Sequence, residues 1–171
     1  MNKNDLYKNK ESIYRVLAIG ERILIIDCIK QNMPFFVDNI RGDSISEKEL
    51  QLETGVILDD VDRIPPNAKK VVYKRYTIIA PIIAVIDDKP RRSSMICYVS
   101  EKYNLSKQTI RTYLCRFLSY QNISVLAPNE KTERELTTDE KNIRWALNKY
   151  YYTRNKNSLK IAYEMMLKAD M

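Results

Sequence analysis

The feature that most constrains the fold is the stretch NLSKQTIRTYLCRF at residues 104–117. Apolar side chains recur in and just after it at i, i+3, i+4, i+7 and i+8, namely Ile110, Tyr113, Leu114, Phe117 and Leu118. This spacing predicts one amphipathic helix over residues 107–120, with Ser106 as its N-cap. Such a helix is stable mainly through packing of its apolar face, so neighbouring segments must cover it.

Two further helices are predicted immediately before this one. Residues 68–86 have an apolar isoleucine face, with a kink expected at Pro81. After a turn at residues 87–92, Ser93 or Ser94 is expected to cap a helix that ends at Tyr103. Three helices with a three-residue turn between the second and third match a helix-turn-helix motif.

The N-terminal part is predicted to contain β structure. Residues 12–19 and 22–29 are rich in β-branched side chains and flank Gly20-Glu21, which favours a hairpin, and residues 34–37 are a further candidate strand. Because an isolated hairpin is marginal in water, it must pack on another part of the protein. A short helix capped by Ser46 should follow, and the Pro65-Pro66 break suggests a domain boundary.

Towards the C-terminus, Thr137 or Thr138 is expected to open a helix to about Tyr152, and Ser158 to cap a last helix to Lys168. The expected fold class is therefore mainly α with a small N-terminal β element, a three-helix helix-turn-helix domain and part of a second helical domain. The expected divisions are a β-hairpin element with an acidic tail at 1–62, the helix-turn-helix domain at 63–121, a linker at 122–136 and a truncated second domain at 137–171.

Composition argues against several classes of function. The chain has no His, and its three Cys are isolated in apolar surroundings. We therefore expect the thiols to be buried, and we expect no disulfide framework, metal site or cofactor. Its three Gly are too scattered for a phosphate-binding loop. No signal peptide or membrane span is evident, so we expect a cytoplasmic protein with no membrane partner and no small-molecule substrate.

Positive charge is concentrated in the middle of the chain. The formal net charge is +7. Residues 1–62 hold 8 Lys+Arg against 12 Asp+Glu, a net −4; residues 63–121 hold 12 against 3, a net +9; residues 122–171 hold 9 against 7, a net +2. A local excess of this size favours a polyanionic partner, and the predicted motif makes double-stranded DNA the expected one.

The predicted site residues lie on the polar side of the third helix and nearby. Those nearest to bases and phosphates should be Ser106, Lys107, Gln108, Thr109, Arg111 and Thr112. Arg91 and Arg92 are expected as backbone or minor-groove contacts, and Lys69, Lys70, Lys74 and Arg75 as phosphate contacts. The simpler interpretation, an ordinary cap with solvated charges, is disfavoured because Lys107 occupies a first turn where the helix dipole favours acids.

Two other clusters keep more than one interpretation. Lys149, Arg154, Lys156 and Lys160 surround three consecutive tyrosines, a pattern typical both of nucleic-acid contact and of a helix core. Closely spaced aspartates at 59–62 and 87–88 resemble a metal-dependent catalytic site, but beside proline breaks they are more typical of turns and solvated surface. We expect no catalysis by this chain.

The order of these segments resembles the N-terminal region of TnsB-type and Mu-type DDE transposases. The resemblance rests on residues 14–36, 75–86, 100–121 and 137–167. It implies two successive helical DNA-binding domains that bind repeats at transposon ends, with other transposition proteins as further partners. In that family a ribonuclease-H-like domain with an Asp, Asp, Glu triad and two Mg²⁺ follows. The chain ends at Met171 without such a domain, so the resemblance implies binding without cleavage.

Two other functions stay open at this level. One is a transcriptional regulator or replication-type DNA binder that uses the same motif. The other is a non-enzymatic interaction module whose acidic first 62 residues bind a partner protein. A reading frame that continues into a domain with widely separated Asp, Asp and Glu residues would favour the transposase. Weak DNA binding that does not depend on sequence would favour the interaction module.

Overall fold

The N-terminal strands form a small antiparallel sheet. The computed structural model describes residues 1–128, 137–152 and 158–169. Strands β2 (Ile13–Ile19) and β3 (Ile23–Asp27) form the predicted hairpin, flanked by β1 (Leu6–Lys8), β4 (Phe35–Val37) and β5 (Asp43–Ile45) in the order β4-β3-β2-β1-β5. Ile19 pairs with Ile23, so the hairpin loop has three residues and β3 begins one residue later than expected.

Alternation of side chains along the strands gives the sheet two apolar faces. Leu24 and Ile26 of β3 belong to the main core that the sheet shares with the helices. Ile23 and Ile25, which point the other way, form a smaller cluster with Val16. The sheet therefore has one face available to support helices, as the marginal stability of a lone hairpin requires.

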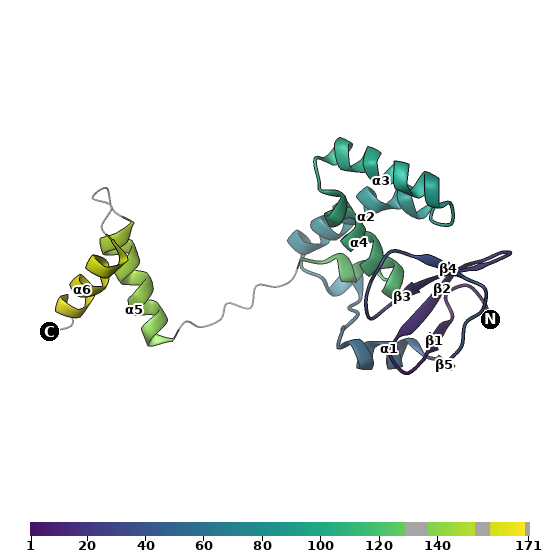
Figure 1. Ribbon diagram of the computed structural model, residues 1–171, viewed down its shortest axis with the longest axis horizontal. Helices are drawn as coiled ribbons and strands as arrows, with labels where there is room; N and C mark the ends of the chain where they lie inside the picture. Colours follow the sequence, from purple (N-terminus) through teal and green to yellow (C-terminus); the bar gives the residue numbers. More distant parts are fainter. Residues whose placement is uncertain (129–136, 153–157, 170–171) are drawn as a thin grey trace. The chain divides into compact units, whose positions relative to one another are not determined.

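Four helices follow the sheet in the same compact unit, residues 1–129. These are α1 (Glu47–Thr54), α2 (Pro66–Ile83), α3 (Lys89–Tyr103) and α4 (Lys107–Tyr120). The predicted Ser46 cap is confirmed, because Ser46 and Glu49 form a capping box. Helix α4 lies between the sheet and the pair α2 and α3 (Figure 1). The predicted fold class, mainly α with a small N-terminal sheet and a helix-turn-helix, is confirmed.

Helix α3 begins earlier than the sequence suggested. Asp88, not Ser93 or Ser94, is its N-cap, and the Asp88 carboxylate accepts a hydrogen bond from Arg91 N at 3.0 Å. Pro90 lies in the first helical turn, where a missing N–H costs nothing. Residues 89–92 are therefore helical, and the turn expected at 87–92 is only partly a turn. This shift moves both predicted arginines onto α3.

The expected boundary near residue 62 does not separate two cores. Buried residues on both sides of it, from Leu6 to Leu126, belong to a single cluster. The first part of the expected linker also belongs to this unit, because Val125 and Leu126 are buried in a short 3-10 helix, η2 (Ile123–Leu126), that packs on α2 and α4. The sequence breaks at Pro65-Pro66 mark a change of element within one unit. The rest of the expected linker, 129–136, lies outside the described residues.

A second unit, residues 130–171, contains the two predicted C-terminal helices. They are α5 (Thr138–Ala146), with a capping box between Thr137 and Glu140, and α6 (Leu159–Ala169). The Ser158 cap is confirmed by the hydrogen bond from Ile161 N to Ser158 Oγ at 3.3 Å. A π-helical turn, η3 (Leu147–Tyr151), continues α5 and was not predicted. None of the helices in the described ranges is long and apolar enough to cross a membrane.

One buried arginine connects the sheet to α1 and α4. The Arg15 side chain, fully buried, donates from Nε to Ser119 O at 2.8 Å and from both Nη atoms to the Glu47 carboxylate at 2.6 and 2.8 Å. Its Nη1 also donates to Asn4 O at 3.2 Å. Because a buried guanidinium is costly unless its donors are paired, these contacts fix the position of α4 on the sheet.

We expect Arg15→Met to lower the free energy of unfolding by about 2–4 kcal/mol, since it leaves the buried Ser119 carbonyl without this donor. Arg22→Met is the matched control, because the Arg22–Asp38 pair is exposed and should contribute less than about 1 kcal/mol. Urea unfolding followed by circular dichroism measures both. Equal losses in the two variants would contradict this role for Arg15.

The predicted buried thiols are confirmed for two of the three cysteines. Cys28 and Cys115 are buried, and burial raises the pKa of each thiol to about 11, whereas Cys97 is half-buried. Because the thiolate is the reactive form, a disulfide reagent at pH 8 should label Cys97 quickly and the other two only after unfolding. Removal of the fast phase by Cys97→Ser checks the assignment; two or more fast thiols would contradict it.

Candidate nucleic-acid interface

Helices α3 and α4 are joined by a tight turn of the helix-turn-helix type. Asn104 ends α3 in the left-handed conformation, with φ of 50°. Leu105 closes the turn in both directions: its N–H donates to Ser100 O at 3.1 Å, and its carbonyl accepts from Ser100 Oγ at 2.6 Å. Ser106 then caps α4 by accepting a hydrogen bond from Thr109 N at 3.0 Å. The turn therefore holds α4 at a fixed angle to α3.

The N-terminal half of α4 presents the predicted polar surface. Ser106, Lys107, Gln108, Arg111 and Thr112 are exposed, and Thr109 is half-buried with its hydroxyl 2.8 Å from that of Ser106. Thr112 Oγ1 donates to Gln108 O at 2.9 Å. Across the part of the chain that the structure describes, no hydrogen bond or ion pair involves the side chains of Gln108 and Arg111. Both remain available to a ligand.

One side of α4 is covered by another part of the chain. Cys115 is buried, as its apolar surroundings predict, although helical spacing alone would place it on the polar side of α4; its Sγ lies 3.7 Å from Met33 Sδ in the connection between β3 and β4. A polar hollow of about 400 Å³ lies where this connection meets α4; its lining comprises Gln31, Asn32, Met33, Gln108, Arg111, Thr112 and Cys115. Local helical periodicity contains no signal for a contact between residues so far apart in sequence.

The two predicted arginines of α3 separate into different roles. Arg91 is exposed and lies 3.3 Å from the Asp88 carboxylate. Arg92 is buried, and donates to Ile86 O at 2.9 Å and to Pro34 O at 3.1 Å. Burial also lowers the pKa of its guanidinium. Arg92 therefore joins α3 to the sheet, a placement that does not fit the expected DNA contact.

The four predicted phosphate contacts of α2 also divide. Lys69 forms an ion pair with Asp62 at 3.0 Å, and Arg75 donates to Leu126 O and Ala127 O while stacking 4.8 Å from the Tyr113 ring centroid. Arg75 thus has a structural role that holds η2 on the helices. The other two, Lys70 and Lys74, are exposed one turn apart on the outer side of α2. Their exposure is compatible with the predicted phosphate contacts.

We expect Arg92→Ala to lower the free energy of unfolding by about 1–3 kcal/mol, because two backbone carbonyls lose a charged donor. Arg91→Ala, on the same helical turn, should change it by less than about 0.5 kcal/mol. Chemical denaturation of both variants measures the difference. Full stability of the Arg92 variant together with weaker DNA binding would contradict the structural role.

The second unit carries its own basic and aromatic surface. Lys149 Nζ lies 4.5 Å from the Trp145 ring centroid and 5.4 Å from that of Tyr150, and Trp145 is 44% exposed. Lys160 is also exposed, whereas Arg154 and Lys156 lie outside the described residues. Tyr150 and Tyr151 are half-buried and Tyr152 is exposed, so the tyrosine run is divided between packing and surface.

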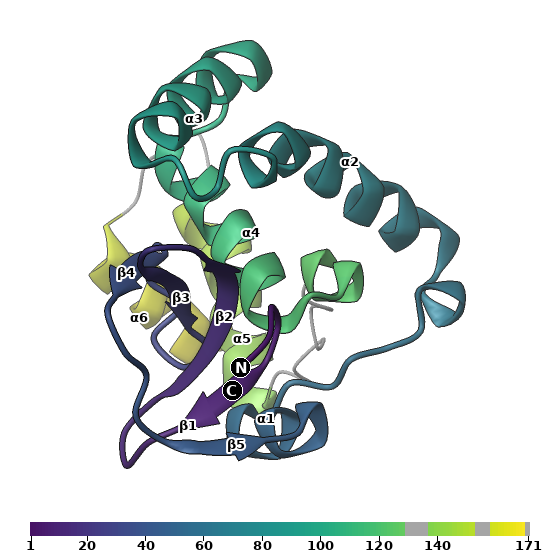
Figure 2. The same cartoon turned by 90° about the vertical axis from the view of Figure 1, so that its right-hand side faces the viewer.

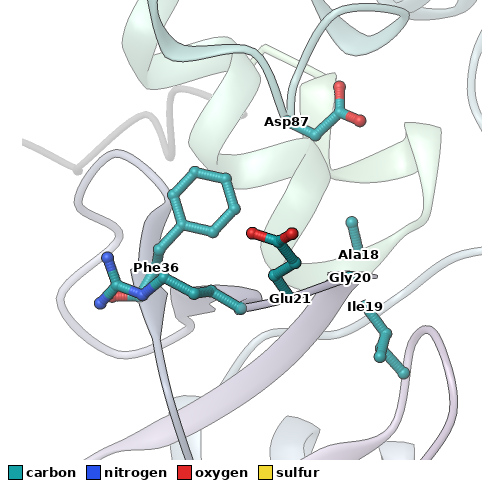
Figure 3. A pocket seen from close by; sticks show the side chains of 7 residues that line it. Ala18, Ile19, Gly20, Glu21, Phe36 and Asp87 are labelled. Carbon is teal, nitrogen blue, oxygen red and sulfur yellow. The ribbon is translucent and has the colours of Figure 1, made fainter.

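A separate hollow of about 400 Å³ lies at the tip of the β2–β3 hairpin (Figure 3). Glu21 from the loop and Asp87 from the α2–α3 connection both line it, beside Phe36. The two carboxylates outnumber the single guanidinium of the lining, that of Arg22, which is already paired with Asp38, so this hollow does not extend the basic surface of α4. Nowhere in the described ranges does a group of three or more metal-binding side chains come together.

The fold and the exposed basic helix define a protein of the helix-turn-helix class. Residues 137–171 match the family model for the TnsB transposase helix-turn-helix domain. No curated protein matches the chain. The predicted resemblance to the DNA-binding region of TnsB-type transposases is therefore confirmed over these residues, and the match supports DNA binding by a transposase-type helix-turn-helix. It begins at the N-cap of α5, so α3 and α4 lie outside it.

Proposed function

We propose that this chain recognises specific double-stranded DNA at the ends of a transposon. The observation that carries the proposal is the family match of residues 137–171, in a chain whose first unit already contains a complete helix-turn-helix. Two helical units in series would suit repeated or extended end sequences. The same match supports a transposase over a transcriptional regulator. We propose binding, and not catalysis, as the role of the described residues.

In the first unit, α4 would enter the major groove with its N-terminal end first. Gln108 would then pair with an adenine edge and Arg111 or Lys107 with a guanine edge, each contact contributing about 1–3 kcal/mol of discrimination. The first turn of α4 has no acidic residue, so the helix dipole and Lys107 attract phosphate together. Lys70 and Lys74 of α2 would contact the DNA backbone, and such contacts position a protein without reading sequence.

The test is a titration of the chain against the terminal sequences of the element and against scrambled duplex, at several salt concentrations. We expect about 10³-fold or greater preference for the terminal sequence. Equal affinities would contradict sequence-specific recognition. Binding that is uniformly weak and insensitive to sequence would instead support the interaction module.

Two pairs of variants separate reading from positioning. Arg111→Ala should cost about 1–3 kcal/mol on the terminal sequence and much less on scrambled DNA, whereas Arg41→Ala, also an exposed arginine, should affect neither. Lys70→Ala should weaken both duplexes alike and reduce the slope of log K against log salt by about 0.9, with Lys3→Ala as its control. An unchanged preference in the Arg111 variant would remove α4 from sequence reading.

A further inference from the structure

The connection between β3 and β4 lies along one side of α4. This connection, residues 28–34, is called here the Asp27 turn because Asp27 anchors it. Cys28 Sγ lies 3.5 Å from Ser119 O, Gln31 Nε2 lies 3.5 Å from Tyr120 Oη, and Met33 contacts Cys115. Strand β3 accordingly lies beside α4 (Figure 2). Towards the N-terminal half of α4, contact gives way to the polar hollow that Asn32 shares with Gln108 and Arg111.

The Asp27 turn is held in one conformation. The buried Asp27 carboxylate accepts hydrogen bonds from Ile29 N and Lys30 N at 2.9 Å each and from Ser12 Oγ at 2.8 Å. The Asp27 carbonyl accepts one from Gln31 N at 2.9 Å, where Gln31 adopts a positive φ of 49°. Asn32 is therefore presented at a fixed place beside α4, so little further ordering is needed when a ligand binds.

The chemistry of the hollow suits an anion. Its lining has two Gln amides, the Asn32 amide, a guanidinium and a hydroxyl, and no carboxylate. The Asn32 side chain is exposed, and the described part of the chain provides no hydrogen-bond partner for it. Lys30, also exposed, is two residues away. A phosphate oxygen would meet donors here and no opposing negative charge.

The dimensions of duplex DNA indicate which part of it would meet the turn. An α-helix with its side chains is about 10–12 Å across and occupies the major groove, which is about 12 Å wide. An element beside that helix must therefore lie over the bordering sugar-phosphate backbone. Resting on the proposed function of α4, we propose that the Asp27 turn is a second DNA contact, in which Asn32 binds a backbone phosphate and sets the register of α4 in the groove.

The experiment compares Asn32→Asp with Asn39→Asp in the full chain, on terminal and scrambled duplex. The two exposed asparagines flank opposite ends of β4 and undergo the same change of charge. Because a carboxylate beside a phosphate is repelled, Asn32→Asp should weaken both duplexes about tenfold, and this loss should shrink at higher salt. Asn39→Asp should change either affinity less than about twofold.

A gain-of-binding variant excludes misfolding as the explanation. Asn32→Lys should tighten binding to both duplexes and increase the magnitude of the salt slope by about 0.9. Equal behaviour of the variants at residues 32 and 39 would overturn the contact. A change in the preference for the terminal sequence, without a common loss, would also overturn a backbone contact.

The failure of this proposal is distinguishable from failure of the proposed function. If the unmodified chain prefers the terminal sequence and Arg111→Ala removes that preference, α4 reads DNA whatever the variants at residue 32 do. If the unmodified chain binds both duplexes equally, the proposed function fails. The effect of Asn32→Asp on the affinity for either duplex then tests the backbone contact alone, and a loss of about tenfold would still support it.

Discussion

The buried guanidinium of Arg15 is the interaction on which the first unit depends. From β2 it reaches three other parts of the chain: the N-terminal segment at Asn4, the start of α1 at Glu47 and the end of α4 at Ser119. Cys28, the first residue of the Asp27 turn, approaches the same Ser119 carbonyl. The sheet thereby supports α4 at its C-terminal end, and the helix-turn-helix is one part of a larger core instead of an independent domain.

This support explains why only one half of α4 is exposed. Seven residues of α4 are buried, and all but Ile110 lie between Leu114 and Tyr120. Its first turn, by contrast, is mostly exposed, and Ser106 caps it. A helix whose C-terminal half is packed in the core and whose N-terminal half presents polar side chains can enter a groove without reorganising its core, and preorganisation of this kind reduces the cost of binding.

The sequence predicted what depends on neighbouring residues. The hairpin, the caps at Ser46, Thr137 and Ser158, and the exposed face of α4 with Gln108 and Arg111 all follow from local spacing. The sequence did not predict the bonds from Arg92 to Pro34 O and from Arg75 to Leu126 O, because these carbonyls are 58 and 51 residues away and leave no local pattern. The predicted start of α3 was wrong because Asp and Ser are both good N-caps and because Pro90, which suggested a turn, is tolerated in the first turn of a helix.

The π-helical turn after α5 affects how this segment compares with its relatives. Tyr152 N donates to Leu147 O, a bond that spans five residues where an α-helix spans four. The side chains at the end of this turn, up to Tyr152, are therefore rotated about the helix axis relative to their places in a regular α-helix. A relative with an uninterrupted α5 would align here only with a one-residue gap, although its helices could pack in the same way.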